Sequence, residues 1–250
     1  EDGTQFQGYS FGAENPVSGE VVFNTAMTGY PESLTDPSYS GQILVATYPL
    51  IGNYGVPKFT EENGMYRFFE ADRIHVRGLI ISDYSFEYSH WNAIESLGKW
   101  LIDNQVPAIW GIDTRQVTKI IRERGVMLGK IVIDGLPEPP QFIDPNKENL
   151  VAQVSTREVI TYGDGKYTVV LVDCGCKYNI IRCLCKRGAK VIRVPWDYDF
   201  TQIDYDGLML SNGPGDPQQC QATIAHIKKA IALGKPIFGI CLGNQLLSIA

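Results

Sequence analysis

The chain has 250 residues, a hydrophobic share of 44% and a formal net charge of −6. This length and apolar content are typical of a globular protein with one large domain or two smaller ones. The acidic balance leaves no basic surface for a phosphate backbone, so we expect no nucleic-acid partner. The longest apolar runs are far shorter than the roughly 20 residues that cross a bilayer, so we expect no membrane span either.

The first half of the chain predicts an α+β domain, because its strands and helices do not alternate regularly. Runs rich in β-branched and apolar residues predict strands at residues 19–25 and 42–48. An apolar stripe predicts a helix over residues 91–104. Asp113 is placed to cap a second helix, which stops at Gly125.

A polar, proline-rich stretch at residues 135–149, which includes Pro140, separates two halves with different patterns. We therefore predict an amino-terminal domain at residues 1–145, a linker at 146–166 and a second domain at 167–250. The last predicted helix is apolar and only partly built, so we expect the second domain to be incomplete at its carboxyl end.

The second half alternates strands with helices, which predicts an α/β domain with a parallel sheet and right-handed crossovers. The expected strands lie at residues 168–173, 190–194, 207–210 and 236–240, and the expected helices at 178–186, 218–233 and 242–250. Ligands in such sheets bind beyond the carboxyl ends of the strands. We therefore look for a site in the loops that follow the strands.

All six cysteines lie between residues 174 and 241, which is unlike the even scatter of a secreted disulfide framework. We therefore expect a reducing compartment, the cytoplasm or alternatively the mitochondrial matrix. The pairs Cys174/Cys176 and Cys183/Cys185 are spaced more closely than the usual paired zinc ligands, so we expect no metal site. Cys183 and Cys185 instead fit a helix, as small apolar side chains on different faces.

Two glycine-rich loops follow strands of the second half, at residues 211–217 and 239–245. The second loop reads G-x-C-x-G at a strand-to-helix junction, which is the cysteine counterpart of the nucleophile elbow. The elbow needs its glycines because the turn is strained, and side chains beside the nucleophile would collide with the strand and helix. Cys241 would project above the sheet at a helix amino terminus, where the helix dipole favours a thiolate.

The elbow also supplies an oxyanion site. The backbone N–H of Leu242 is placed to stabilise the oxyanion that forms when Cys241 attacks a carbonyl, and Gly213 is a candidate for the second donor. The alternative is that Cys241 is a buried packing cysteine whose glycines only permit a tight connection. The motif alone leaves both interpretations open.

The two loops and their flanks resemble a known family. Residues 239–247 resemble the nucleophile segment of class I glutamine amidotransferases, and residues 211–217 resemble their oxyanion-side loop. The stretches that look like the amino-terminal domain of the carbamoyl-phosphate synthetase small subunit are residues 1–4, 19–25, 29–32, 34–39 and 111–115. Residues 173–179 and 194–197 resemble the eukaryotic versions, in which glutaminase and synthetase share one polypeptide. The resemblance implies a flavodoxin-like second domain.

The resemblance also implies the chemistry. Cys241 would attack the side-chain amide carbon of glutamine, release ammonia and form a thioester that water hydrolyses to glutamate. Leu242 and Gly213 would hold the oxyanion through their N–H groups. The residues that match glutamine-binding positions are Ser38, Gly213, Gly215, Leu242 and Gln245. Ser38 comes from the first half of the chain, so the first domain is expected to close over the site.

Ammonia would then pass to a synthetase partner that uses bicarbonate and ATP to make carbamoyl phosphate, in pyrimidine or arginine synthesis. The sequence has no G-x-x-x-x-G-K-[ST] phosphate loop. We therefore expect no cofactor in this region, since ATP, Mg²⁺ and bicarbonate belong to the partner.

The chain departs from the family pattern in two places. The family base is a His followed two residues later by a Glu, and none of His75, His90 and His226 is followed in this way. The resemblance therefore implies that the base lies beyond Ala250. Asn244 stands where active glutaminases commonly have His, a feature shared with ammonia-dependent relatives, which replace the cysteine by Ser. A degenerate glutamine-binding or regulatory module is thus the alternative, and a cysteine hydrolase of another kind is a third hypothesis.

Overall fold

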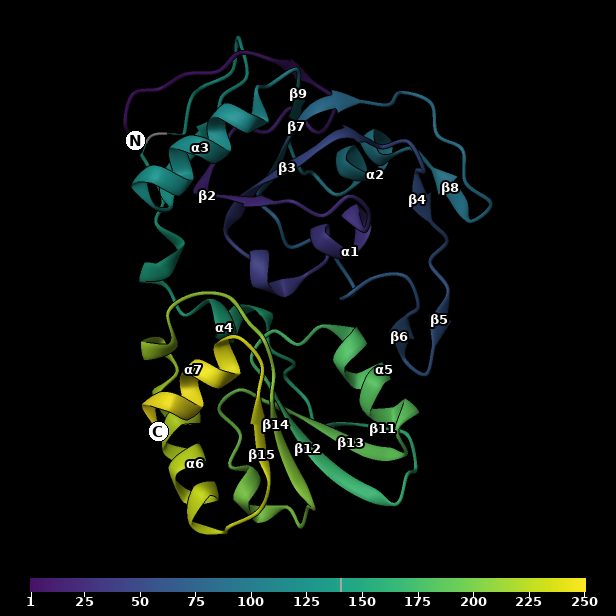
Figure 1. Ribbon diagram of the computed structural model, residues 1–250, viewed down its shortest axis with the longest axis vertical. Coiled ribbons are helices and arrows are strands. Elements are labelled where there is room, and N and C mark those ends of the chain that lie inside the picture. Colours follow the sequence, from purple (N-terminus) through teal and green to yellow (C-terminus); the bar gives the residue numbers. More distant parts are fainter. Residues whose placement is uncertain (140) are drawn as a thin grey trace. The chain divides into compact units, whose positions relative to one another are not determined.

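The computed structural model describes residues 1–139 and 141–250, which form two units (Figure 1). The first unit comprises Glu1–Thr35, Tyr39–Thr60 and Arg73–Pro145, and the second comprises Asp36–Ser38, Glu61–Asp72 and Asn146–Ala250. Two short segments from the first half of the sequence therefore belong to the second unit. Pro140, which falls in the predicted connector, lies outside the described residues.

The first unit is built on a six-stranded mixed sheet in the order β1-β9-β7-β3-β2-β10. The four inner strands run parallel to one another, and the two edge strands β1 and β10 run antiparallel to them. The bounds are β1 Tyr9–Ser10, β2 Val17–Asn24, β3 Gln42–Ile51, β7 Gly78–Tyr84, β9 Ala108–Trp110 and β10 Met127–Ile131. The strands predicted at 19–25 and 42–48 are confirmed as β2 and β3.

Helix α3 (Thr114–Arg124) covers this sheet through one apolar side. Its Val117 and Ile121 join Val45 of β3 in a buried cluster. The Asp113 carboxylate accepts a hydrogen bond from the N–H of Gln116 at 2.8 Å, which is the expected cap. The helix ends at Gly125, whose φ of +88° suits glycine, so this predicted helix is confirmed.

The helix predicted over residues 91–104 is shorter than expected. It begins at Leu97 as α2 (Leu97–Asp103), because the side chain of Ser96 caps it by accepting from the N–H of Lys99. Residues before it form β8 (Ala93–Glu95), which pairs with β4 (Val56–Pro57). The apolar stripe of residues 91–104 therefore spans a short strand and a helix. Periodicity alone does not distinguish these two elements in a short apolar run.

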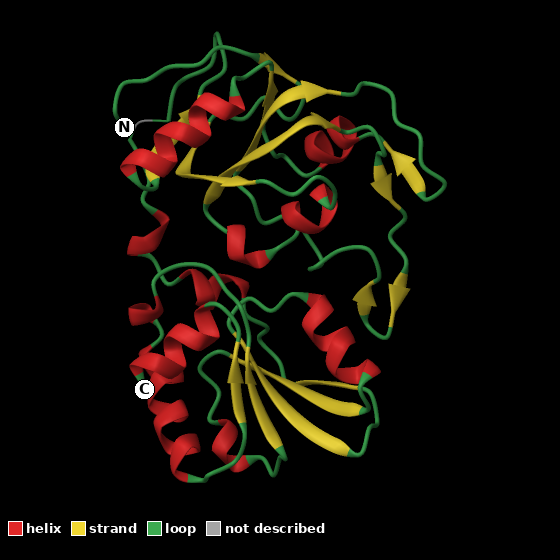
Figure 2. Ribbon diagram, in the orientation of Figure 1, coloured by secondary structure: helices red, strands yellow, loops and turns green. Residues whose placement is uncertain are grey.

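The second unit contains a five-stranded sheet in the order β11-β13-β12-β14-β15. Four strands are parallel, as predicted, and β11 is an antiparallel edge strand. The bounds are β11 Ile160–Tyr162, β12 Tyr167–Asp173, β13 Ala189–Pro195, β14 Gly207–Leu210 and β15 Ile237–Gly239. The helices are α4 Leu150–Val154, α5 Tyr178–Lys186, α6 Gln221–Ala232 and α7 Leu242–Ile249, and they flank the sheet in Figure 2.

Strand β12 shows how both faces of this sheet are covered. Val170 and Val172 join one buried cluster with side chains of α6 and α7, whereas Leu171 joins another cluster with Ile181 of α5. Successive strand side chains point to opposite faces, so an uninterrupted apolar strand needs helices on both sides. The predicted α/β architecture is confirmed, and α6 starts at Gln221 rather than at residue 218 because Pro217–Gln219 form a 3-10 turn.

Residues 146–166, predicted as a linker, carry secondary structure of their own. They include α4, capped by the side chain of Asn149, and the edge strand β11. Val151 of α4 is buried in the cluster of the α6 and α7 side. The predicted domain bounds themselves stay a prediction.

No helix in the described residues is long and apolar enough to cross a membrane.

Candidate active site

Cys241 lies directly before α7, separated by one residue from the end of β15, in a strained backbone conformation. Its φ is +51° and its ψ is −111°, a region that residues with a side chain rarely occupy. The side chain is exposed, so the alternative of a buried packing cysteine is wrong. A strained residue that presents its sulfur to solvent is typical of a nucleophile elbow.

The two glycines of the elbow are required by close backbone packing. A Cβ on Gly239 would lie 2.5 Å from the carbonyl carbon of Gly243, and a Cβ on Gly243 would lie 2.3 Å from the carbonyl oxygen of Leu210. Neither contact is tolerated between real atoms, and neither partner is a flexible side chain. Strand β15 and helix α7 therefore meet at Cys241 only because both flanking positions lack a side chain.

The loop at residues 211–217 touches the elbow from the end of the adjacent strand β14. The N–H of Gly243 donates to the carbonyl oxygen of Ser211 at 3.0 Å. A Cβ on Gly213 would lie 2.8 Å from Cδ2 of Leu242 and 1.9 Å from the carbonyl oxygen of Cys174. Leu242 is the first residue of α7, so its N–H has no partner within the helix. The structure thus brings Gly213 and Leu242 together beside Cys241, while their oxyanion role stays a prediction.

Ser38 belongs to the second unit and lies next to the same loop. The side-chain nitrogen of Asn212 donates to Oγ of Ser38 at 2.8 Å, and Asn212 itself is only 3% exposed. Ser38 is therefore hydrogen-bonded to the residue that directly precedes Gly213. Sequence reasoning selected Ser38 through the resemblance but did not select Asn212, whose only signal was a polar side chain between Ser211 and Gly213.

Gly215 and Gln245 lie farther along the two loops. Gly215 adopts a φ of +81° beside Leu150 of α4, which explains why a glycine is needed there. Gln245 lies one turn into α7, where its N–H donates to the carbonyl oxygen of Cys241 at 3.1 Å and its side chain is exposed. Asn244 is exposed beside it. Contacts of Gly215 and Gln245 with glutamine stay predictions.

A buried ion pair supports the backbone beneath Gly213. Asp173 is fully buried at the end of β12, and its carboxylate accepts from Nε of Arg193 at 2.8 Å. The same carboxylate accepts the N–H groups of Gly175 and Cys176 at 2.9 and 2.7 Å. Burial opposes the charge on Arg193, yet the nearby Asp173 carboxylate holds the pKa of the guanidinium above its usual value. The pair fixes the turn against which Gly213 packs.

Three other thiols of this unit differ from Cys241 because they are buried. Cys174, Cys176 and Cys220 are buried, and burial raises the pKa of Cys174 and of Cys176 well above the usual thiol value. Burial, helped by the charge of Asp216, raises the pKa of Cys220 to about 11. These thiols are therefore protonated and inert, whereas Cys241 is open to a substrate.

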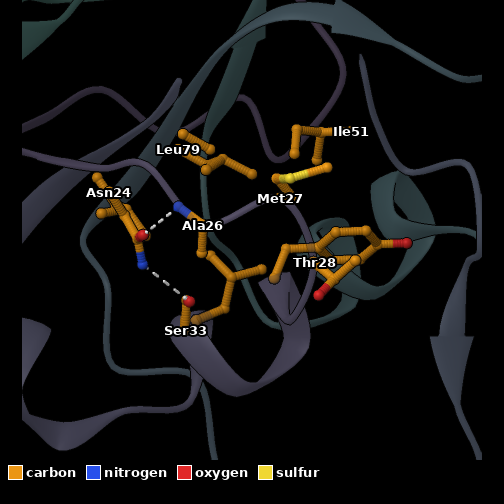
Figure 3. Close-up of a pocket in the computed structure, with 11 residues that line it drawn as sticks. Asn24, Ala26, Met27, Thr28, Ser33, Ile51 and Leu79 are labelled. Atoms are coloured by element: carbon orange, nitrogen blue, oxygen red, sulfur yellow. Dashed lines mark hydrogen bonds between the residues drawn. The ribbon is translucent and has the colours of Figure 1, made fainter. Parts of the chain in front are cut away.

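The first unit contains a small, mostly apolar pocket (Figure 3). The amide of Asn24 closes part of it, because its oxygen accepts from the N–H of Ala26 at 2.7 Å and its nitrogen donates to Oγ of Ser33 at 3.2 Å. The lining residues are Asn24, Ala26, Met27, Thr28, Tyr30, Ser33, Leu34, Leu44, Ala46, Ile51 and Leu79. None of the predicted site residues lines this pocket.

The comparison with known families decides the assignment of the chain. Residues 1–131 match the family described as carbamoyl-phosphate synthase small chain, CPSase domain. The chain belongs to the carbamoyl-phosphate synthase small-chain family. Residues 170–250 match the class I glutamine amidotransferases, which agrees with the parallel sheet and the elbow at Cys241.

Several relatives match the chain over its whole length. The "Multifunctional protein CAD" of Squalus acanthias is 55% identical over the whole chain, which spans 11% of that protein. The human "Carbamoyl-phosphate synthase [ammonia], mitochondrial" is 51% identical, and the chain spans 17% of it. The "Carbamoyl phosphate synthase arginine-specific small chain" of Saccharomyces cerevisiae is 48% identical, and the chain spans 64% of it. The chain therefore corresponds to a minor part of the first two proteins.

Proposed function

We propose that the chain is the glutamine-hydrolysing part of a carbamoyl-phosphate synthetase. The observation that carries the proposal is the exposed Cys241, held in a strained elbow against the loop of Gly213. Membership in the small-chain family supports glutamine as the substrate, since the amidotransferase match covers both loops.

In the proposed reaction, Sγ of Cys241 forms a bond to the side-chain amide carbon of glutamine. The carbonyl oxygen becomes an oxyanion, which the N–H groups of Leu242 and Gly213 stabilise. The carbon–nitrogen bond then breaks, and the nitrogen leaves as ammonia with the proton that the thiol gave up. Water hydrolyses the resulting thioester to glutamate and restores the thiol. The proton passes through a base, which the family resemblance gives as the His of a His-x-Glu pair.

We further propose that the ammonia is used by a synthetase, which binds ATP, Mg²⁺ and bicarbonate. Two of the relatives are long proteins in which a chain of this kind occupies 11% and 17% of the length, which supports a synthetase on the same polypeptide. The compartment proposed is the cytoplasm, with the mitochondrial matrix as the alternative. Pyrimidine and arginine synthesis are the two pathways proposed for the product.

Replacement of the nucleophile tests the proposed reaction. In the full-length protein, Cys241→Ser should lower glutamine-dependent ammonia release at least about a thousandfold, because the hydroxyl is a far weaker nucleophile than the thiolate. Cys183→Ser, the same change in an α5 cysteine, should leave the rate near that of the wild type. Full activity in Cys241→Ser would contradict the proposal.

A second candidate is a module that binds glutamine without hydrolysing it. Asn244 in the elbow favours this function, as does the 51% identity to a relative whose name specifies ammonia. The two candidates differ in one measurement on the full-length protein. Glutamine binding without ammonia release would support the binding module, whereas stoichiometric ammonia and glutamate would support the glutaminase.

A further inference from the structure

Four polar residues of the second unit close a ring of interactions at the edge of the proposed site. The side-chain nitrogen of Asn212 donates to Oγ of Ser38 at 2.8 Å, and the N–H of Ser38 donates to the carboxylate of Asp36 at 2.9 Å. The other carboxylate oxygen of Asp36 lies 2.6 Å from Nζ of Lys177. The N–H of Lys177 donates to the side-chain oxygen of Asn212 at 3.1 Å, which closes the ring. We call these four residues the Asn212 ring.

Asn212 uses its whole amide in this ring. Its oxygen accepts from Lys177, and its nitrogen donates both to Ser38 and, at 3.4 Å, to Asp36. Asn212 is 3% exposed, whereas its bonds to Ser38 and Lys177 are partly buried. This amide has one orientation, because a flip would turn its nitrogen toward the N–H of Lys177 and its oxygen toward the carboxylate of Asp36.

This orientation determines the role of the Ser38 hydroxyl. A hydroxyl has one donor and two acceptor positions, and one acceptor position of Ser38 is taken by Asn212. Within residues 1–139 and 141–250 the structure gives the hydroxyl hydrogen of Ser38 no acceptor. Ser38 thus keeps its hydroxyl hydrogen for donation to an oxygen of a ligand.

We infer that Asn212 is a positioning residue of the glutaminase site, which holds Ser38 as a hydrogen-bond donor to the α-carboxylate of glutamine. The inference rests on the proposed function, in which Leu242 and Gly213 hold the side-chain carbonyl of glutamine. The carboxylate is then the remaining group of the substrate that only accepts hydrogen bonds. Asn212 acts through Ser38 and does not touch the reacting atoms.

The test is steady-state kinetics of the full-length protein with glutamine. Asn212→Ala and Asn212→Asp should each raise KM about tenfold, the effect of one hydrogen bond to a charged group, with kcat close to that of the wild type. Asn149→Asp is the matched control, because Asn149 caps α4 in the same unit without contacting Ser38. A fall in kcat with unchanged KM would overturn the assignment to the carboxylate.

A second readout separates positioning from general damage to the loop. In Asn212→Asp the new carboxyl faces Asp36, which raises its pKa, and Lys177, which lowers it. Once protonated, it donates to Ser38 again, so its KM should fall back toward that of the wild type as the pH is lowered. The KM of Asn212→Ala should show no such recovery, and a parallel pH profile for both variants would contradict the inference.

A double-mutant cycle completes the test. In a Ser38→Ala background, Asn212→Ala should change KM by less than about twofold, because the two residues act through one contact. Glutamine affinity measured by calorimetry in the Cys241→Ser background should show the same coupling. Coupled binding without hydrolysis would refute the proposed glutaminase and retain the inference. Hydrolysis without coupling would refute the inference alone, and absence of both binding and hydrolysis would refute both.

Discussion

The elbow at residues 239–243 and the loop at residues 211–217 follow neighbouring parallel strands, but different forces hold them. The elbow is shaped by backbone contacts so close that Gly239 and Gly243 have no room for a side chain. The second loop is held by side chains, because Asn212 and Ser211 bond to residues from distant parts of the chain. The elbow depends on two glycines that have no side chain, and the loop depends on hydrogen bonds between buried polar groups.

This difference predicts how a substitution in each loop destabilises the protein. Adding a carbon to the elbow should cause a local steric conflict, whereas removing a polar partner near the other loop should leave buried groups without hydrogen bonds. The second kind of damage is larger where the lost partner is charged and fully buried. The predictions below test this contrast.

The largest effect is expected from the ion pair beneath Gly213. Asp173→Asn should lower the free energy of unfolding by roughly 3–5 kcal/mol, because it leaves Arg193 buried without its counter-charge. The matched control is Asp204→Asn, whose carboxylate is fully exposed and whose partner Lys235 is half-buried, with an expected loss under about 1 kcal/mol. Urea unfolding of the two variants measures the difference, and equal losses would contradict the assignment of a buried charge.

The next prediction concerns the alkylation rates of two thiols, one in each region. Cys241 is exposed in the elbow, whereas Cys220 is buried after the second loop and has a pKa of about 11. Near neutral pH, iodoacetamide should modify Cys241 at least about a hundredfold faster than Cys220, because only thiolates react and a high pKa leaves few of them. Peptide mass mapping over time measures both rates. Comparable rates in the folded protein would contradict the proposed nucleophile.

A smaller change is expected when the elbow receives one carbon. Gly243→Ala should cost about 2 kcal/mol of unfolding free energy and most of the ammonia release, since its Cβ meets the carbonyl oxygen of Leu210 at 2.3 Å. Gly207→Ala in strand β14 is the matched control, because the nearest atom there is the carbonyl oxygen of Pro236 at 3.8 Å. That variant should retain both stability and activity. A tolerated Gly243→Ala would show that the elbow is not defined by steric exclusion.

The same contrast explains which parts of the structure the sequence predicts. The elbow, the α3 cap at Asp113 and the alternating strands and helices are local features, so a few neighbouring residues reveal them. The Asn212 ring joins residues 36, 38, 177 and 212, and no local pattern links such distant positions. The start of α2 was also misjudged, because β8 continues the apolar stripe and its pairing with β4 is a tertiary contact.

The resemblance supplied what local patterns did not. Ser38 is an ordinary serine in an Asp-Pro-Ser turn, and only the family match marked it as a site residue. The structure assigns it to the second unit next to the loop of Gly213. The partners that hold Ser38 were missed because a family motif names the residues that touch the substrate and not those that orient them.

The last prediction concerns stability at alkaline pH. Burial keeps the Cys220 thiol protonated in the folded protein up to a pKa of about 11, whereas an unfolded thiol ionises near the usual value of 9.0. Between these pH values the unfolded state binds fewer protons, so the free energy of unfolding should fall as the pH rises, with the full contribution present below pH 9. In Cys220→Ala this contribution is absent, and the stability of the variant should decline less over the same interval. Urea unfolding of both proteins across that range measures the two slopes, and identical slopes would show that Cys220 is not shielded from water in the way its burial behind the loop requires.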